Sequence, residues 1–160
     1  MINDIILHTM EHNGDRVRST IFMQKYSDDY YDDYKQIYED CFYKMRSELE
    51  LYPINAGDSK EELQEKANNI YLYFEDNILI GSVAIFDNEI DELIVAKGHQ
   101  KKGYGKLILN YAISRMQEAN ISPIILQVTD WNKGAIKLYQ DNGFSIVKTE
   151  SIKHPGIVRK

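Results

Sequence analysis

The stretch from Glu92 to Val128 constrains the fold of this chain more than any other part of the sequence. It begins with an apolar run, ELIVA, continues through the loop GHQKKGYGK and a segment of helical periodicity, and ends in a second apolar run, PIILQV. A strand, a helix and a further strand in this order form a crossover, which joins parallel strands. The two runs are therefore predicted to be parallel neighbours, with the glycine loop where the crossover begins.

The segments around this crossover predict antiparallel strands and one further helix. IYLYF, ILIGSVAIF and EIDELIVA are separated only by EDN and DN, and connections this short allow only hairpins. Further along, NKGAIKLYQDN is predicted to be a helix that Asn132 caps and Gly143 ends. Phe144 then opens a last strand, FSIVKTESI.

The first part of the chain predicts two strands and two helices. Apolar and polar residues alternate on both sides of Asn13-Gly14, a dipeptide that favours tight turns, so an antiparallel hairpin is predicted here. After Ser27 an apolar stripe at spacings of three and four predicts an amphipathic helix. The stripe consists of Tyr34, Tyr38, Cys41, Met45 and Leu49. Ser59 and Glu62 form a capping box, which predicts the start of a second helix.

The predicted order is β-β-α-α-β-β-β-α-β-α-β, a mixed α/β fold with a mostly antiparallel sheet and one central parallel pair. The 160 residues contain no repeat or linker, so one domain over residues 1–160 is expected. Cys41, the single cysteine, cannot form an internal disulfide. His8 and His12 lie on a predicted strand, where a spacing of four separates them too far for a shared metal.

Charge and hydropathy exclude several classes of function. The formal net charge of -6 argues against nucleic acid as a partner, because proteins that bind duplexes usually carry a basic face. No apolar run approaches the ~20 residues that a membrane span requires, and the N-terminus does not resemble a signal peptide. We expect a soluble cytoplasmic protein. Acidic residues are densest in SDDYYDDYKQIYED, whereas the glycine loop is locally basic, which would suit a cation at one end of a site and a polyanion at the other.

Two known phosphate-binding patterns fail at the glycine loop. Gly98 and Gly103 have the separation of a P-loop, but Tyr104 and Gly105 stand where lysine and a hydroxyl residue are required. The dinucleotide-binding pattern fails because Ile108 replaces its third glycine. What remains is a group of backbone N–H donors at a helix N-terminus, which can bind an anion without a metal. The alternative is an ordinary surface turn without a ligand, in which the glycines only end one element and begin the next.

The segments on either side of the loop carry a resemblance to a known family. Q-x-x-G-x-G at residues 100–105, preceded by ELIVA and followed by DWNKGAIKLYQDNGF, resembles the GNAT superfamily of acetyl-coenzyme A dependent N-acetyltransferases. The resemblance covers residues 17–152, and the predicted order of elements agrees with that fold. Residues 1–14 lie outside the resemblance, so they are expected to form a strand and a hairpin turn in addition to the family's fold. The resemblance also implies a longer final strand than this chain offers, so we expect an incomplete sheet edge and a homodimer that covers it.

The resemblance implies where acetyl-coenzyme A binds, without a metal. The pantetheine arm would pair with the main chain of Leu93, Ile94 and Val95, where the two parallel strands splay. The pyrophosphate would rest on backbone amides of the loop, which consists of Gln100, Lys101, Lys102, Gly103, Tyr104, Gly105 and Lys106. On the later helix the residues implied to contact the cofactor are Asn132, Ala135 and Tyr139, with Tyr139 pointing at the sulfur. A packed aromatic residue is the alternative for Tyr139, because the chain has 12 tyrosines.

Acetyl transfer to an amine needs a base, a donor for the growing oxyanion and a proton for the thiolate. The N–H of Val95 is expected to serve the oxyanion, and Tyr139 the thiolate. The base is expected to be Glu92 or Glu89, ranked equally and acting through water, with Asp91 third. Period-two alternation predicts Glu89 and Asp91 on the face of Leu93 and Val95, and Glu92 on the opposite face, unless a bulge intervenes.

Branches of the family differ in where their acidic residues stand. The histone acetyltransferase branch has its glutamate at the position of Glu89, and polyamine acetyltransferases have acidic residues at those of Asp91 and Glu92. The branch that acetylates ribosomal protein N-termini uses a glutamate where this chain has Gln127, so that branch is disfavoured.

The expected function is transfer of an acetyl group from acetyl-coenzyme A to a primary amine by direct attack. An acidic, tyrosine-rich first helix favours a small cationic amine. A peptide or protein amine remains open, and a non-catalytic acyl-coenzyme A sensor is the rival of another class. The residues expected to contact the amine are Tyr34, Tyr38, Glu48 and Tyr52.

Overall fold

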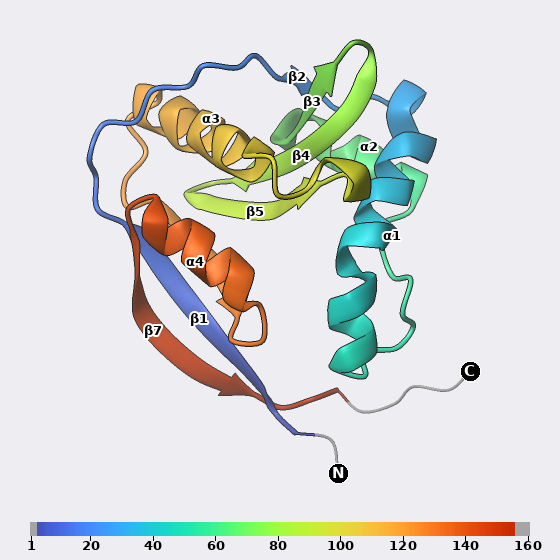
Figure 1. The fold of residues 1–160 in the computed structure, drawn as a ribbon, viewed down its shortest axis with the longest axis vertical. Helices are drawn as coiled ribbons and strands as arrows, with labels where there is room; N and C mark the ends of the chain where they lie inside the picture. Colours follow the sequence, from blue (N-terminus) through green and yellow to red (C-terminus); the bar gives the residue numbers. More distant parts are fainter. Residues whose placement is uncertain (1–2, 156–160) are drawn as a thin grey trace.

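A computed structural model describes residues 3–155, which form a seven-stranded mixed sheet with helices on both faces (Figure 1). The strand order is β2-β3-β4-β5-β6-β1-β7. The strands are β1 (Ile5–His12), β2 (Gln24–Lys25), β3 (Ile70–Glu75), β4 (Ile78–Phe86), β5 (Glu89–Val95), β6 (Ile125–Thr129) and β7 (Phe144–Ile152). The helices are α1 (Tyr31–Glu48), α2 (Lys60–Lys66), α3 (Tyr104–Glu118) and α4 (Lys133–Asp141). Short 3-10 turns span Asp28–Tyr30, Ala67–Asn69 and Lys97–His99.

The central crossover is confirmed. β5 and β6 are parallel, and every other pair of neighbouring strands is antiparallel. The parallel pairing covers only Glu89 with Ile125 and Ile90 with Leu126. Beyond these two pairs β5 continues to Val95 without pairing to β6. The strands therefore splay, as the family resemblance implied.

The predicted hairpin at Asn13-Gly14 is wrong. Gly14 does adopt a positive φ of 86°, but β1 pairs with β6 and β7 rather than with the segment that follows it. That segment runs beside α3, where the side chain of Gln117 bonds to the N–H of Val17 and the carbonyl of Asp15. Its apolar residues Val17 and Ile21 pack on the core instead of pairing with β1, because both edges of β1 are already paired with β6 and β7. Only the two residues of β2 join the sheet, at its opposite edge.

The expected gap at the last sheet edge is absent. β1 lies between β6 and β7 and is antiparallel to both, so the N-terminal strand completes this half of the sheet. Its registers join Met10 to Leu126 on one side and to Ile146 on the other. The strand that resembled an appendage is thus internal to the sheet, and β7 forms the outer edge.

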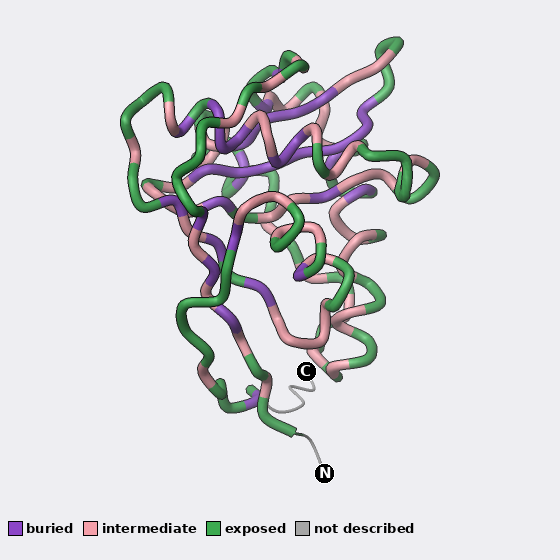
Figure 2. Tube along the Cα trace, turned by 60° about the vertical axis from the view of Figure 1, so that its left-hand side comes forward, coloured by how far each residue is buried: buried purple, intermediate pink, exposed green. Residues whose placement is uncertain are grey.

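Two hydrophobic clusters hold the helices to the sheet. The first joins α3 and α4 to one face, and the second joins α1 and α2 to the other. Buried segments concentrate in the middle strands of the sheet (Figure 2). On α3 the buried positions Ile108, Ala112 and Met116 confirm the predicted helical stripe. Over residues 3–155 no helix has both the length and the apolar character needed to cross a membrane.

Gly81 allows α3 to pack closely on β4. A Cβ atom at this position would lie 2.6 Å from the Ile94 carbonyl oxygen and 2.6 Å from Cδ1 of Ile108. Both distances are far below van der Waals contact, so only glycine fits between the strand and the helix.

Candidate active site

The splayed strands leave main-chain groups of β5 facing an opening. The N–H of Ala96 donates to the carbonyl of Ile80 over 2.7 Å, and the register pairs Val95 with Gly81. Because bonded and non-bonded pairs alternate in an antiparallel ladder, Val95 directs its N–H and carbonyl away from β4. The N–H of Val95 therefore faces the side on which β6 has diverged.

A bulge in β5 changes which side chains share a face. Asp91 pairs with Ala84 and Ile94 with Ser82, so Val83 alone opposes two residues of β5. The bulged residue Glu92 has a φ of 50°.

The bulge makes the alternation that we predicted for β5 partly wrong. Ile90 packs in the same cluster as Leu93 and Val95, whereas Ile94 packs in the cluster of α1 and α2. Neighbouring side chains on a strand point to opposite faces, so Glu89 and Asp91 lie on the α1 face and not on that of Leu93 and Val95. Glu92 lies on the α1 face, as predicted. All three acidic candidates are therefore on one face.

Glu92 is held by two tyrosine hydroxyls from α1. Tyr38 donates to Oε1 over 3.2 Å, and Tyr34 donates to Oε2 over 3.5 Å. Burial and the nearby charge of Asp91 raise the pKa of the Glu92 carboxyl, and the hydrogen bond from Tyr38 opposes this. A carboxylate with a raised pKa is suited to accept a proton near neutral pH.

Glu89 and Asp91 differ from Glu92 in their contacts. Burial and the charge of Asp91 also raise the pKa of Glu89. Asp91 is exposed, and its Oδ1 accepts the backbone N–H of Glu92 over 2.9 Å, which fixes the bulge. Of the three carboxylates, Glu92 has the most hydrogen-bond donors directed at it.

Tyr139 and Asn132 lie on α4, across the sheet from α1. The side chain of Asn132 accepts the N–H of Ala135 over 3.1 Å, which confirms the predicted cap. Tyr139 is half-buried and packs against Phe144, with ring centroids 6.0 Å apart. Burial and the charge of Asp91 raise the pKa of the Tyr139 hydroxyl to about 12. This hydroxyl stays protonated at neutral pH and can therefore donate a proton or a hydrogen bond.

The glycine loop forms the N-terminus of α3. Gly103 caps the helix with a φ of 88°, and its carbonyl accepts the first helical bond, from the N–H of Leu107. The amides that precede this bond have no helical acceptor, so they face outward at the positive end of the helix dipole. Lys101, Lys102 and Lys106 are exposed, and within residues 3–155 none of them has an ion pair.

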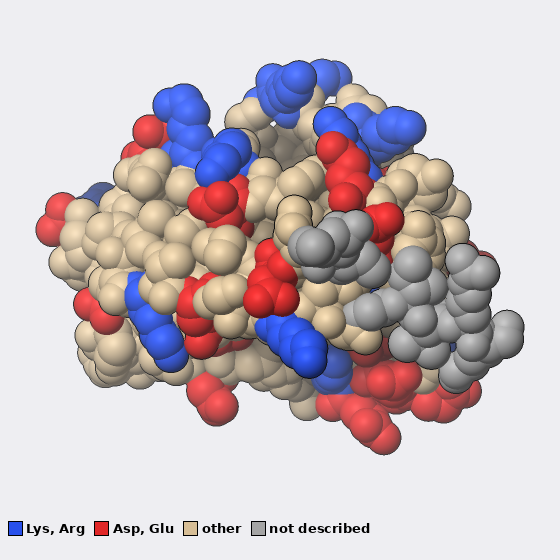
Figure 3. Space-filling view, turned by 90° about the horizontal axis from the view of Figure 1, so that it is seen from below, with Lys and Arg blue, Asp and Glu red and all other residues tan. Residues whose placement is uncertain are grey.

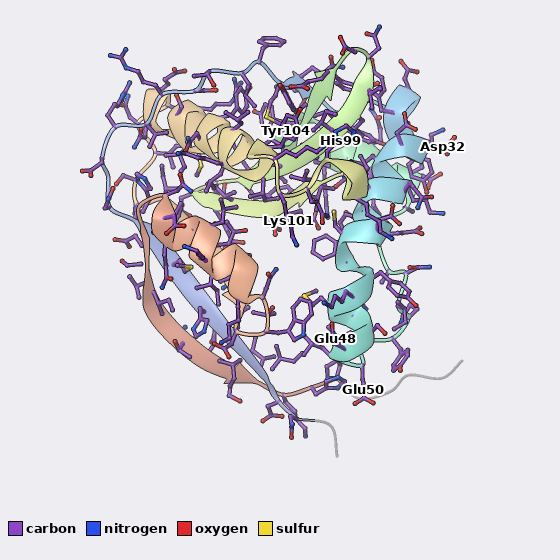
Figure 4. The ribbon with its side chains drawn as sticks, in the orientation of Figure 1. Asp32, Glu48, Glu50, His99, Lys101 and Tyr104 are labelled. Atoms are coloured by element: carbon purple, nitrogen blue, oxygen red, sulfur yellow. The ribbon has the colours of Figure 1, made fainter. Side chains whose placement is uncertain are left out.

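The side chains of the loop point in different directions. Lys101 projects toward the side where α4 and α1 face each other, whereas His99 and Tyr104 lie together beside the sheet (Figure 4). The hydroxyl of Tyr104 donates to Glu75 over 2.7 Å. Tyr104 can therefore serve an anion only through its backbone N–H.

Cys41 and Gln100 form a contact that the sequence did not indicate. Cys41 donates its thiol to the Val95 carbonyl over 3.1 Å, and Nε2 of Gln100 donates to the same oxygen over 3.1 Å. The loop and α1 are thereby tied to the end of β5. Burial raises the pKa of the Cys41 thiol, so it stays protonated. These bonds engage the Val95 carbonyl, and its N–H remains the group that faces the opening.

A cavity of about 260 Å³ lies between α1 and α2. Its walls are the residues Tyr31, Tyr34, Lys35, Tyr38, Glu39, Asn55, Gly57, Asp58, Ser59, Glu62 and Leu63. The expected contacts Tyr34 and Tyr38 are therefore brought together, beside Glu92. Glu48 and Tyr52 do not line this cavity, because Glu48 lies at the C-terminal end of α1 (Figure 4) and Tyr52 is exposed beyond it.

Charged side chains are unevenly distributed on the surface seen in Figure 3. Seen from below, Lys and Arg side chains gather along the upper edge, and Asp and Glu side chains dominate the middle and lower parts (Figure 3).

One known protein family matches the part of the chain that contains these residues. The family described as "Acetyltransferase (GNAT) family" matches residues 27–144, which include α1, the splayed strands, the glycine loop and α4. The chain belongs to the GNAT acetyltransferase family. The matched residues of this GNAT protein include the loop, the opening and the carboxylates of β5.

Individual relatives are more distant. Streptothricin acetyltransferase A of Bacillus subtilis is 30% identical over 89 residues, which are 52% of this chain and 51% of the relative. The chain thus spans about half the length of that relative. The [Ribosomal protein bS18]-alanine N-acetyltransferase of Haemophilus influenzae is 28% identical over 118 residues, which are 71% of this chain and 79% of the relative.

A solved structure supports the fold of this GNAT protein. The PaiA N-acetyltransferase from Thermoplasma acidophilum, in complex with coenzyme A, superposes with a TM-score of 0.66 at 20% identity. The superposition covers 83% of this chain and 98% of that one.

Proposed function

We propose that this GNAT protein transfers the acetyl group of acetyl-coenzyme A to a primary amine of a small cationic molecule, by direct attack. The observation that carries the proposal is the Glu92 carboxylate, which is half-buried and hydrogen-bonded on the α1 face of the sheet, beside the opening between β5 and β6. An ammonium group that arrives there meets a carboxylate able to accept its proton.

The residues of the opening fit acetyl-coenzyme A. When bound, this co-substrate supplies an activated thioester. Val95 directs its N–H at the opening. The amides of residues 103–106, with the three loop lysines that have no ion pair within residues 3–155, would hold the pyrophosphate. The coenzyme A complex of the PaiA relative supports this assignment.

Each step of the transfer has a candidate residue. Glu92 takes the proton from the incoming ammonium, directly or through water, and leaves a neutral amine. The N–H of Val95 donates to the oxygen that gains negative charge, and it is fixed before the reaction by the sheet. Tyr139 donates its hydroxyl proton toward the departing sulfur. Glu89 is the second candidate for the base, since its pKa is also raised.

The acceptor is placed on the α1 face. The three carboxylates of β5 and the tyrosine rings of α1 attract a cation. The streptothricin acetyltransferase relative is consistent with such a substrate. A protein N-terminus is the second candidate, because a relative acts on a ribosomal protein alanine.

Calorimetry and thiol release test the proposal together. Purified protein is titrated with acetyl-coenzyme A, and free thiol is then measured with diamines, polyamines, aminoglycosides and an alanine peptide. Saturable binding with thiol release for the cationic amines is the expected result. Binding without release for any amine would favour the acyl-coenzyme A sensor instead, and release only with the peptide would favour the second candidate.

A further inference from the structure

Glu92 receives its two hydrogen bonds from residues one helical turn apart. Tyr34 and Tyr38 lie on the same face of α1, four residues apart, so both hydroxyls reach one carboxylate. Each hydroxyl serves a different oxygen, at 3.2 Å for Tyr38 and 3.5 Å for Tyr34. Two separate donors restrict rotation of the carboxylate about its last bond.

The rings that carry these hydroxyls are themselves fixed. Tyr34 is only 3% exposed and packs edge-on against Tyr26, with centroids 5.5 Å apart. Tyr38 packs against Phe42 at 4.7 Å, and a Cβ at Gly57 would lie 3.3 Å from its ring. Neither ring can turn away without displacing its neighbours.

The charged groups around Glu92 act in opposite directions. Asp91 on β5 and Asp58, which precedes α2, raise the pKa of Glu92, whereas Lys66 on α2 lowers it. From α1, only the hydroxyls of Tyr34 and Tyr38 face the carboxylate among described residues. Burial and the charge of Glu92 raise the pKa of both tyrosines, so both remain donors throughout the working pH range.

We infer that Tyr34 and Tyr38 are positioning residues that hold the Glu92 carboxylate in one orientation, and that the nearer hydroxyl, of Tyr38, favours its ionised form. The inference rests on the proposed function of Glu92 as the base. It assigns the hydroxyls of the two tyrosines to the base, while their rings still line the cavity proposed for the acceptor amine.

The substitution Tyr38→Phe tests this inference with two readouts. The first is the ¹³C NMR titration of the Glu92 carboxyl, assigned by its loss in Glu92→Gln, which needs no substrate. The second is the pH profile of kcat/KM for the best amine. Loss of a hydrogen bond to the carboxylate raises the pKa of Glu92, so the NMR midpoint and the acid limb of the profile both move to higher pH. Tyr34→Phe, with the longer contact, is expected to move both less.

Tyr43→Phe is the matched control, because Tyr43 lies on α1 but is 56% exposed and away from Glu92. It should leave both midpoints unchanged, and thermal melting checks that each variant folds. An unchanged NMR midpoint in folded Tyr38→Phe would overturn the inference. If no amine gives thiol release but the NMR midpoint still moves, the proposed function fails and the positioning of Glu92 by Tyr38 stands.

Discussion

At the scale of single residues, Glu92 occupies a position that a folded chain tolerates at a cost. Its carboxyl is partly removed from water, lies beside Asp91, and belongs to a residue with positive φ, which a glutamate rarely adopts. Strained and desolvated residues concentrate at functional sites, because their environment is set by the reaction rather than by stability. The two tyrosines that hold the carboxylate offset only part of this cost.

The substitution Glu92→Gln is expected to stabilise the protein at neutral pH. The folded-state pKa of Glu92 is above its unfolded value, so the folded state binds the proton more tightly. Wild type therefore loses stability relative to the variant as pH rises from the unfolded pKa through the folded one. Thermal melting of both proteins between pH 4 and pH 8 measures this. Equal melting temperatures at every pH would contradict the expected burial of the charge.

At the scale of elements, the sequence predicted the helix caps and hairpins that depend on neighbouring residues. The capping box of α2, the Asn132 cap of α4 and the short β-hairpins were all correct, because each depends on residues close together in the chain. The bulge in β5 was not predictable, since no glycine marks it and Glu92 takes the positive φ. That single residue reversed the faces expected for Glu89 and Asp91.

Gly81→Ala tests how closely α3 packs on β4. The added Cβ would collide with the Ile94 carbonyl, which is backbone and cannot rotate away, so a loss of about 1–3 kcal/mol in the free energy of unfolding is expected. Gly134→Ala is the control, because a Cβ there meets nothing within 4 Å. It should be neutral or stabilising in a helix. Urea unfolding of both variants gives the comparison, and an unaffected Gly81→Ala would contradict the close packing.

At the scale of the whole molecule, the sheet is completed by strands from the two ends of the chain. Pairing β1 with β6 and β7 joins residues more than a hundred positions apart, and no nearby signal in the sequence indicates such a contact. Alternation along residues 5–12 predicted a strand but not its partners. The family resemblance covered residues 17–152, so it gave no information on where the additional strand lies.

Met10→Ala measures whether β1 is part of the core. Met10 is fully buried between β6 and β7, so its truncation is expected to cost about 2–5 kcal/mol of unfolding free energy. Ile6→Ala on the same face of β1 is the control, because Ile6 is 38% exposed. A loss in Met10→Ala no larger than in Ile6→Ala, by denaturant unfolding, would mean that β1 is an appendage after all.

The most direct test of the proposed reaction compares kcat/KM of Glu92→Gln and Glu89→Gln with the same amine across the pH range. If Glu92 is the base, Glu92→Gln loses about 10²-fold or more and its acid limb disappears, whereas Glu89→Gln retains the limb of the wild type. Acetyl-coenzyme A binding, followed by calorimetry, should be unchanged in both. Retention of activity and of the acid limb by Glu92→Gln would contradict the assignment of the base.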